Sequence, residues 1–172
     1  MEPEIAIAWG EPPPGMLATK PGLSAILKAA SDFASARNVE VQLFDAAAVV
    51  NLDHLRSAAM HAIRAKERGS MRASTLGMEM ILYAAGRRQI REAVALVGLG
   101  DRTLRIAAVV VGPGASASAS DLLSALECRS LPEAAAGGAP ALERLNIRAG
   151  CASPGQLPDI VLEQVALLDT DR

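Results

Sequence analysis

The chain of 172 residues has very few aromatic side chains: one Trp, one Tyr and two Phe. Proteins that hold single-stranded nucleic acids usually stack bases on aromatic rings, so such a function would need another stacking group here. The two cysteines, Cys128 and Cys151, form no CxxC motif, and no disulfide framework is expected. No apolar run approaches the roughly 20 residues that span a bilayer. Because the acidic N-terminus also lacks a secretory signal, the sequence predicts a cytoplasmic protein without a membrane partner.

Hydrophobic residues make up 51% of the chain and charged residues 21%, enough apolar material for one core, and we expect a single domain over residues 1–172. Apolar patterning predicts strands at 4–9, 39–44 and 104–111, the last one central because its apolar run is continuous. It predicts helices at 23–37, 51–68, 75–85, 89–96, 120–127, 141–145 and 159–169. The expected fold class is therefore α/β, with a small mixed β-sheet flanked by helices.

No motif in the sequence predicts catalysis. The pairs Gly98-Leu99-Gly100 and Gly112-Pro113-Gly114 lack the residues that complete a phosphate-binding or dinucleotide-binding loop, so they are interpreted as turns. His54 and His61 lie seven residues apart on one helix face without a third ligand, which favours surface or interface histidines over a zinc site. We therefore expect no cofactor, no metal and no enzyme activity.

Positive charge is concentrated in one part of the chain. Residues 56–91 contain eight basic and two acidic residues, so this window carries +6 and the rest of the chain −8. Either a phosphate-binding face or an ordinary solvated helical surface would account for this. Seven of the eight basic residues are Arg, whose flat guanidinium can stack on bases, and this favours single-stranded RNA weakly.

Glu79 is the only charged residue in the apolar segment 75–85. A helix that is apolar on nearly every side is expected to be buried, and a buried carboxylate needs partners. We expect a structural ion pair with an arginine of the basic window rather than a general base, because no second catalytic group accompanies Glu79.

Several segments are similar to one known family. They are 41–46 (VQLFDA), the pairs His54-Leu55 and His61-Ala62, 75–90 (TLGMEMILYAAGRRQI) and 165–169 (VALLD). These residues resemble the kinase-binding subunit of the KEOPS complex, the family that includes the PRPK-binding protein. The resemblance covers residues 38–112 and 158–170. The high ratio of Arg to Lys fits an archaeal member.

The resemblance implies a non-catalytic, regulatory subunit in tRNA threonylcarbamoyl-adenosine modification. Such a subunit binds and stimulates the small atypical kinase of KEOPS, contacts the other subunits indirectly, and in archaea captures the 3′ CCA end of tRNA. The basic window coincides with this RNA role. Our hypothesis is that phosphates or terminal bases contact four basic residues, while two hydroxyl residues present their side chains and helix amides to the same anion. These six residues are Lys66, Arg72, Arg87 and Arg88, with Ser74 and Thr75. For Arg87 and Arg88, the alternative is that they cap the helix ending at 85–86.

Kinase binding should use apolar surface, because interface cores are depleted of charge. The C-terminal helix has more apolar positions than one face requires, and we expect the interface to use Ile160, Val165 and Leu168. Core packing is the alternative for each of them, and Ile160 or Leu168 should be partly exposed.

Two further functions stay open. The first is a kinase-binding scaffold without RNA contact, which the salt dependence of tRNA binding would distinguish. The second is a small α/β enzyme that binds a metabolite at the end of the 109–112 segment.

Overall fold

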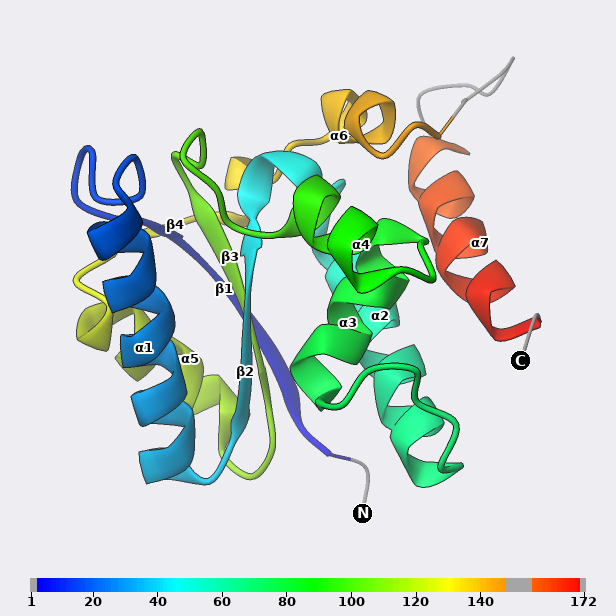
Figure 1. Ribbon diagram of the computed structural model, residues 1–172, viewed down its shortest axis with the longest axis horizontal. Coiled ribbons are helices and arrows are strands. Elements are labelled where there is room, and N and C mark those ends of the chain that lie inside the picture. Colours follow the sequence, from blue (N-terminus) through cyan, green and yellow to red (C-terminus); the bar gives the residue numbers. More distant parts are fainter. Residues whose placement is uncertain (1–2, 148–155, 171–172) are drawn as a thin grey trace.

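The computed structural model describes residues 3–147 and 156–170, and these form three layers with a β-sheet in the middle (Figure 1). The strands are β1 (Ile5–Glu11), β2 (Glu40–Asp45), β3 (Ile106–Val111) and β4 (Arg129–Leu131). The helices are α1 (Lys20–Arg37), α2 (Leu52–Glu67), α3 (Leu76–Ala85), α4 (Ile90–Val97), α5 (Ala115–Ala125), α6 (Ala139–Arg144) and α7 (Leu157–Thr170), with 3-10 turns at Ala46–Ala48 and Glu133–Ala135. The predicted α/β class is confirmed.

The sheet has the order β2-β3-β1-β4, and each neighbouring pair is antiparallel. Ile5 of β1 faces Val111 of β3, and Glu40 of β2 faces the same residue from the other side. The prediction of a mixed sheet is therefore wrong. The physical reason is that β1 and β2 run parallel to each other but never pair, because β3 lies between them.

This order interleaves two β-α-β units. In one unit α1 connects β1 to β2, and in the other α5 connects β3 to β4. Each unit leaves room between its strands for one strand of the other unit, which is the split β-α-β arrangement. Both connecting helices lie on the same face of the sheet (Figure 1).

Two apolar clusters cover the two faces of the sheet. α1 and α5 pack on one face, around Ile26, Leu43 and Leu122. α2 and α3 pack on the other face, around Phe44, Leu55 and Leu82, and α4 and α7 pack against these two helices. All six residues of β3 are buried between the clusters, as the continuous apolar run predicts. No helix in the described ranges is both long and apolar enough to cross a membrane.

Candidate functional site

Most of the basic window, residues 56–91, belongs to α2, to α3 and to the loop that joins these two helices. α3 begins at Thr75, whose Oγ1 accepts a hydrogen bond of 3.2 Å from the main-chain N–H of Met78. It ends at Gly86, which adopts φ 60°, a left-handed conformation that glycine takes without a Cβ penalty. Both ends of α3 are therefore fixed by local sequence, and these ends carry the residues predicted to bind RNA.

The six predicted RNA-binding residues fall into two groups at opposite ends of α3. Lys66 lies at the end of α2, and Arg72, Ser74 and Thr75 follow in the connecting loop and at the helix start; all four are exposed. Arg87 and Arg88 come after the other end of α3. Ten helical residues separate the groups by about 15 Å at 1.5 Å per residue.

The first group borders a cleft of about 790 Å³ between α1 and α3. Lys66 and Thr75 line it, and Lys66 Nζ lies 3.9 Å from Glu40 Oε1. Its floor includes β2, an edge strand of the sheet. The amide of Gln42 projects into this region, where its Nε2 donates a hydrogen bond of 2.9 Å to the Leu43 carbonyl.

Arg87 holds the C-terminal end of α3. Its Nη1 donates to the carbonyls of Gly86 (3.1 Å) and Ala85 (3.4 Å), and its Nη2 donates to the Leu145 carbonyl (3.0 Å). The guanidinium thus binds carbonyls at the end of α3 and joins them to the turn after α6, which is the helix-capping role weighed as the alternative. Contact between Arg87 and RNA stays a prediction, as it does for the exposed Arg88.

Glu79 is fully buried, as the sequence predicts. Its Oε2 accepts hydrogen bonds from the main-chain N–H groups of Arg72 (2.9 Å) and Ala73 (2.8 Å). These bonds fix the loop that carries Arg72 and Ser74, so Glu79 supports the candidate RNA surface from below. The predicted arginine partner of Glu79 stays a prediction.

His54 differs from the surface or interface role expected of both histidines. His54 is fully buried: its Nδ1 accepts from the Val50 N–H at 3.2 Å and its Nε2 lies 2.8 Å from the Ala84 carbonyl. This pairing requires the neutral tautomer with its proton on Nε2. Burial lowers the pKa of His54 to about 4, outweighing the hydrogen bond to Ala84, which raises it. His54 is thus a core residue, whereas His61 does lie at an interface, between α2 and α7.

His61 belongs to a polar cluster that the sequence did not predict. Asp169 of α7 accepts hydrogen bonds from the hydroxyl of Tyr83 and from Arg68 Nη2 (3.3 Å), and its Oδ2 lies 2.5 Å from His61 Nδ1. Burial raises the pKa of Asp169, but these hydrogen bonds and the charges of His61 and Arg68 lower it more, so the net shift is downward. The partners lie about a hundred residues away in the chain, and no local pattern relates them.

The C-terminal helix buries most of the residues expected at the kinase interface. Val165 and Leu168 are buried where α7 packs on α2 and α3, so their side chains belong to the core of this chain. Ile160 is partly exposed, which agrees with the expectation that either Ile160 or Leu168 would be. Leu167, which was not selected from the sequence, is 45% exposed.

The described residues offer little for catalysis. No group of three or more His, Cys, Asp or Glu side chains among them could hold a metal ion. Cys128 is half-buried, and burial raises the pKa of its thiol to about 11, so it is a poor nucleophile near neutral pH. Cys151 lies outside the described residues.

Comparison with known families identifies the chain. The family described as kinase binding protein CGI-121 matches residues 23–134, well over half of the sequence. The chain belongs to the CGI-121 kinase-binding protein family. This confirms the predicted resemblance and extends it on both sides of residues 38–112, although α7 lies outside the matched range. No match was found among the curated proteins compared.

Proposed function

We propose that this CGI-121 family member is a non-catalytic KEOPS subunit that binds and stimulates the small kinase and captures the 3′ CCA end of tRNA. The observation that carries the proposal is the family match over the segment that builds α2, α3 and the cleft. The family match identifies a kinase-binding protein. The KEOPS assembly, the stimulation of the kinase and the binding of tRNA are our proposal.

The candidate kinase surface lies on α4 and α7. Of the five large apolar residues that are exposed among those described, three lie on these helices: Ile90 (42%), Val94 (36%) and Leu167 (45%). α4 and α7 also adjoin, because Gln89, Glu92, Gln164 and Leu167 line one hollow. Leu167 lines this hollow and Val94 lines another, and exposed apolar side chains on adjoining helices are typical of a protein interface. Ile160 on α7 stays in the proposal, whereas Val165 and Leu168 support the surface from within.

The candidate RNA surface is the cleft beside Lys66 and Thr75, with Arg72 and Ser74 on the loop next to it. Its volume of about 790 Å³ falls in the range of pockets that hold small ligands, so it could admit a terminal nucleotide. The Lys66 ammonium and the Arg72 guanidinium would supply charge for the phosphates. Arg88 would extend the basic surface toward the other end of α3, while Arg87 chiefly holds the helix end.

The kinase part is tested by isothermal titration of the partner kinase with the Leu167→Asp variant. Burying a charge in an interface core costs several kcal/mol, so we expect the affinity to fall at least about tenfold. Leu27→Asp is the matched control, since Leu27 is 46% exposed on α1, across the sheet from α7. Equal affinity of the Leu167 variant and the wild type, with an unchanged fold, would contradict this surface.

A further inference from the structure

A third surface lies where three loops meet at one end of the sheet. The loop after β1 contains Pro12, Pro13 and Pro14, and Figure 1 shows it at the same end as the loop that enters β3. Together with the turn between α5 and β4, these loops line a cavity of about 560 Å³. This cavity lies at the opposite end of the sheet from the RNA cleft. It borders the end of β1, whereas Lys66 of the cleft lies near Glu40 at the start of β2, and these two strands run in the same direction.

The cavity presents apolar surface to solvent. Leu104 lines it and is 78% exposed, more than any other large apolar side chain among the described residues. Pro14 is exposed and Pro13 is partly exposed, so both add apolar area, whereas Pro12 and Leu17 are buried at the same cavity. An isolated leucine on a surface needs no explanation, but a leucine beside three prolines around a cavity forms a patch that can take up an apolar side chain.

The charges around this cavity are mostly negative. Asp101 and Glu127 line it, and neither has an ion-pair partner among the described residues. Glu11 is neutralised by Arg129, whose Nε donates to it at 3.0 Å. The three prolines contribute no main-chain N–H donors, and the carbonyl of Pro13 already accepts a hydrogen bond of 3.1 Å from the Met16 N–H. The surface therefore offers acceptors and negative charge, which repels phosphates and attracts cationic donors.

We propose that this surface, defined by Leu104, the loop of Pro12–Pro14, Asp101 and Glu127, docks a segment of a partner protein that carries Lys or Arg next to an apolar side chain. The apolar side chain would cover Leu104 and the prolines, and the cationic group would pair with Asp101 or Glu127. This surface is separate from the proposed RNA cleft, whereas Asp101 shares a second hollow with Val94 of the proposed kinase surface. It would let the protein contact a further protein while the RNA cleft is occupied.

The test uses the full ¹⁵N-labelled chain and two synthetic peptides, Gly-Lys-Leu-Lys-Leu-Lys-Gly and its charge-reversed partner with Glu in place of Lys. We expect the basic peptide to shift the amide resonances of Gly15, Asp101, Leu104 and Glu127, and the acidic peptide to shift none of them. The double variant Asp101→Asn with Glu127→Gln should bind the basic peptide about three- to tenfold more weakly, the range that two exposed ion pairs support. Leu104→Ser should weaken it further.

The control replaces two exposed acids outside this cavity, Glu143→Gln with Glu163→Gln, and it should leave the affinity unchanged. Unchanged affinity of the Asp101/Glu127 variant, equal binding of both peptides, or shifts spread over the whole surface would overturn the proposal. So would concentration-dependent self-association that Leu104→Ser abolishes, because the occupant would then be a second copy of this chain.

Discussion

His54 makes the stability of the fold depend on pH through a single side chain. Its imidazole is neutral in the core, and burial holds its pKa near 4, against 6.5 for an exposed histidine. The unfolded chain therefore binds a proton below about pH 6.5 that the folded chain rejects until about pH 4. The stabilisation is complete above pH 6.5, falls as the pH decreases, and levels off near pH 4 after a loss of about 3 kcal/mol.

Urea unfolding between pH 7 and pH 4 tests this prediction, with His54→Gln as the variant that cannot titrate. We expect the unfolding free energy of the variant to be lower at pH 7 but to depend less on pH over this window. Asp169 does not confuse the result: its lowered pKa affects stability only below about pH 5, and it does so equally in both proteins. An identical pH dependence in both proteins would show that His54 is not the buried neutral group described here.

Arg87 gives a second test at the residue scale, because it separates helix capping from RNA binding. Arg87→Ala removes three hydrogen bonds to carbonyls and should lower the unfolding free energy by about 1–3 kcal/mol. Arg91→Ala, an exposed arginine on the adjacent helix, should change it by less than about 0.5 kcal/mol. Equal stability of the two variants in urea would contradict the capping role.

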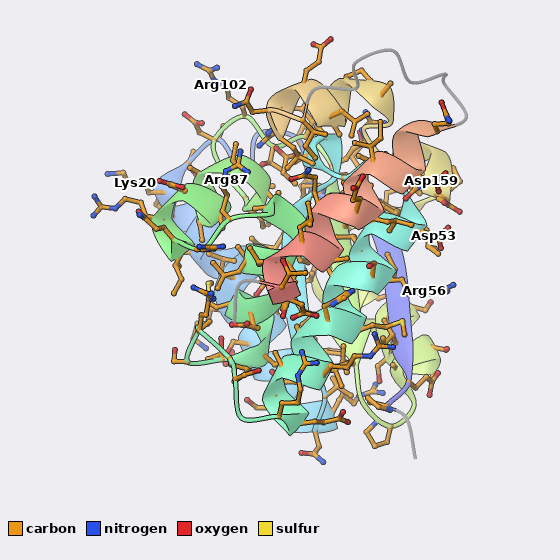
Figure 2. All side chains as sticks on the ribbon, turned by 90° about the vertical axis from the view of Figure 1, so that its right-hand side faces the viewer. Lys20, Asp53, Arg56, Arg87, Arg102 and Asp159 are labelled. Atoms are coloured by element: carbon orange, nitrogen blue, oxygen red, sulfur yellow. The ribbon has the colours of Figure 1, made fainter. Side chains whose placement is uncertain are left out.

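Among the elements, α7 is held by both apolar and polar contacts. Val165 and Leu168 pack into the core, and Asp169 joins the helix to Tyr83 of α3 and to His61 and Arg68 of α2 and its C-terminal end. The candidate kinase surface depends on this anchoring, because Leu167 lies in the same turn of α7 as the buried Val165 and Leu168 and the hydrogen-bonded Asp169. Figure 2 shows α7 running across the face formed by α2 and α3.

Asp169→Asn should therefore loosen α7 before it affects the rest of the fold. The amide keeps the shape but loses the charge that holds His61 and Arg68, so we expect faster amide hydrogen exchange throughout α7. α5, on the other side of the sheet, serves as the internal control and should exchange at its wild-type rate. Unchanged exchange in α7, or equal acceleration in α5, would contradict the anchoring role.

The same scale shows what the sequence could and could not predict. β3 was predictable because a continuous apolar run has one explanation in a layered fold, and α3 because Thr75 and Gly86 mark its ends. β4 was missed because its three residues are mostly exposed and carry no apolar alternation. α5 was predicted five residues too late, since its first six residues alternate Ala and Ser with a period of two and show no helical periodicity.

The candidate site follows the same division between local and distant contacts. Glu79 was recognisable as a buried carboxylate because its own helix is apolar throughout. The burial of His54 was not, because it depends on the Ala84 carbonyl from a helix 30 residues away. The antiparallel sheet was missed for a related reason: strand order depends on packing between distant segments, which composition and periodicity do not encode.

For the molecule as a whole, the proposed RNA cleft lies apart from the two proposed protein surfaces. The cleft lies between α1 and α3, whereas the proposed kinase surface on α4 and α7 and the proposed docking surface at Leu104 meet at one hollow, which Val94 and Asp101 line. An adaptor that holds RNA and a protein at the same time requires such a separation, because one partner must not displace the other. The polarised charge agrees with this arrangement, since the basic residues of the window lie on α2, in the loop after it, and between α3 and the start of α4.

The most direct test of the account is titration of the protein with tRNA, intact and with the 3′ CCA removed, at two salt concentrations. We predict binding that requires the CCA end and weakens steeply with salt, because phosphate contacts release counterions. Lys66→Glu with Arg72→Glu should abolish it, while the control Arg56→Glu with Arg102→Glu, exposed outside the cleft, should weaken it only slightly. Equal or absent binding to the two RNAs would contradict tRNA capture and leave a kinase-binding scaffold without RNA contact.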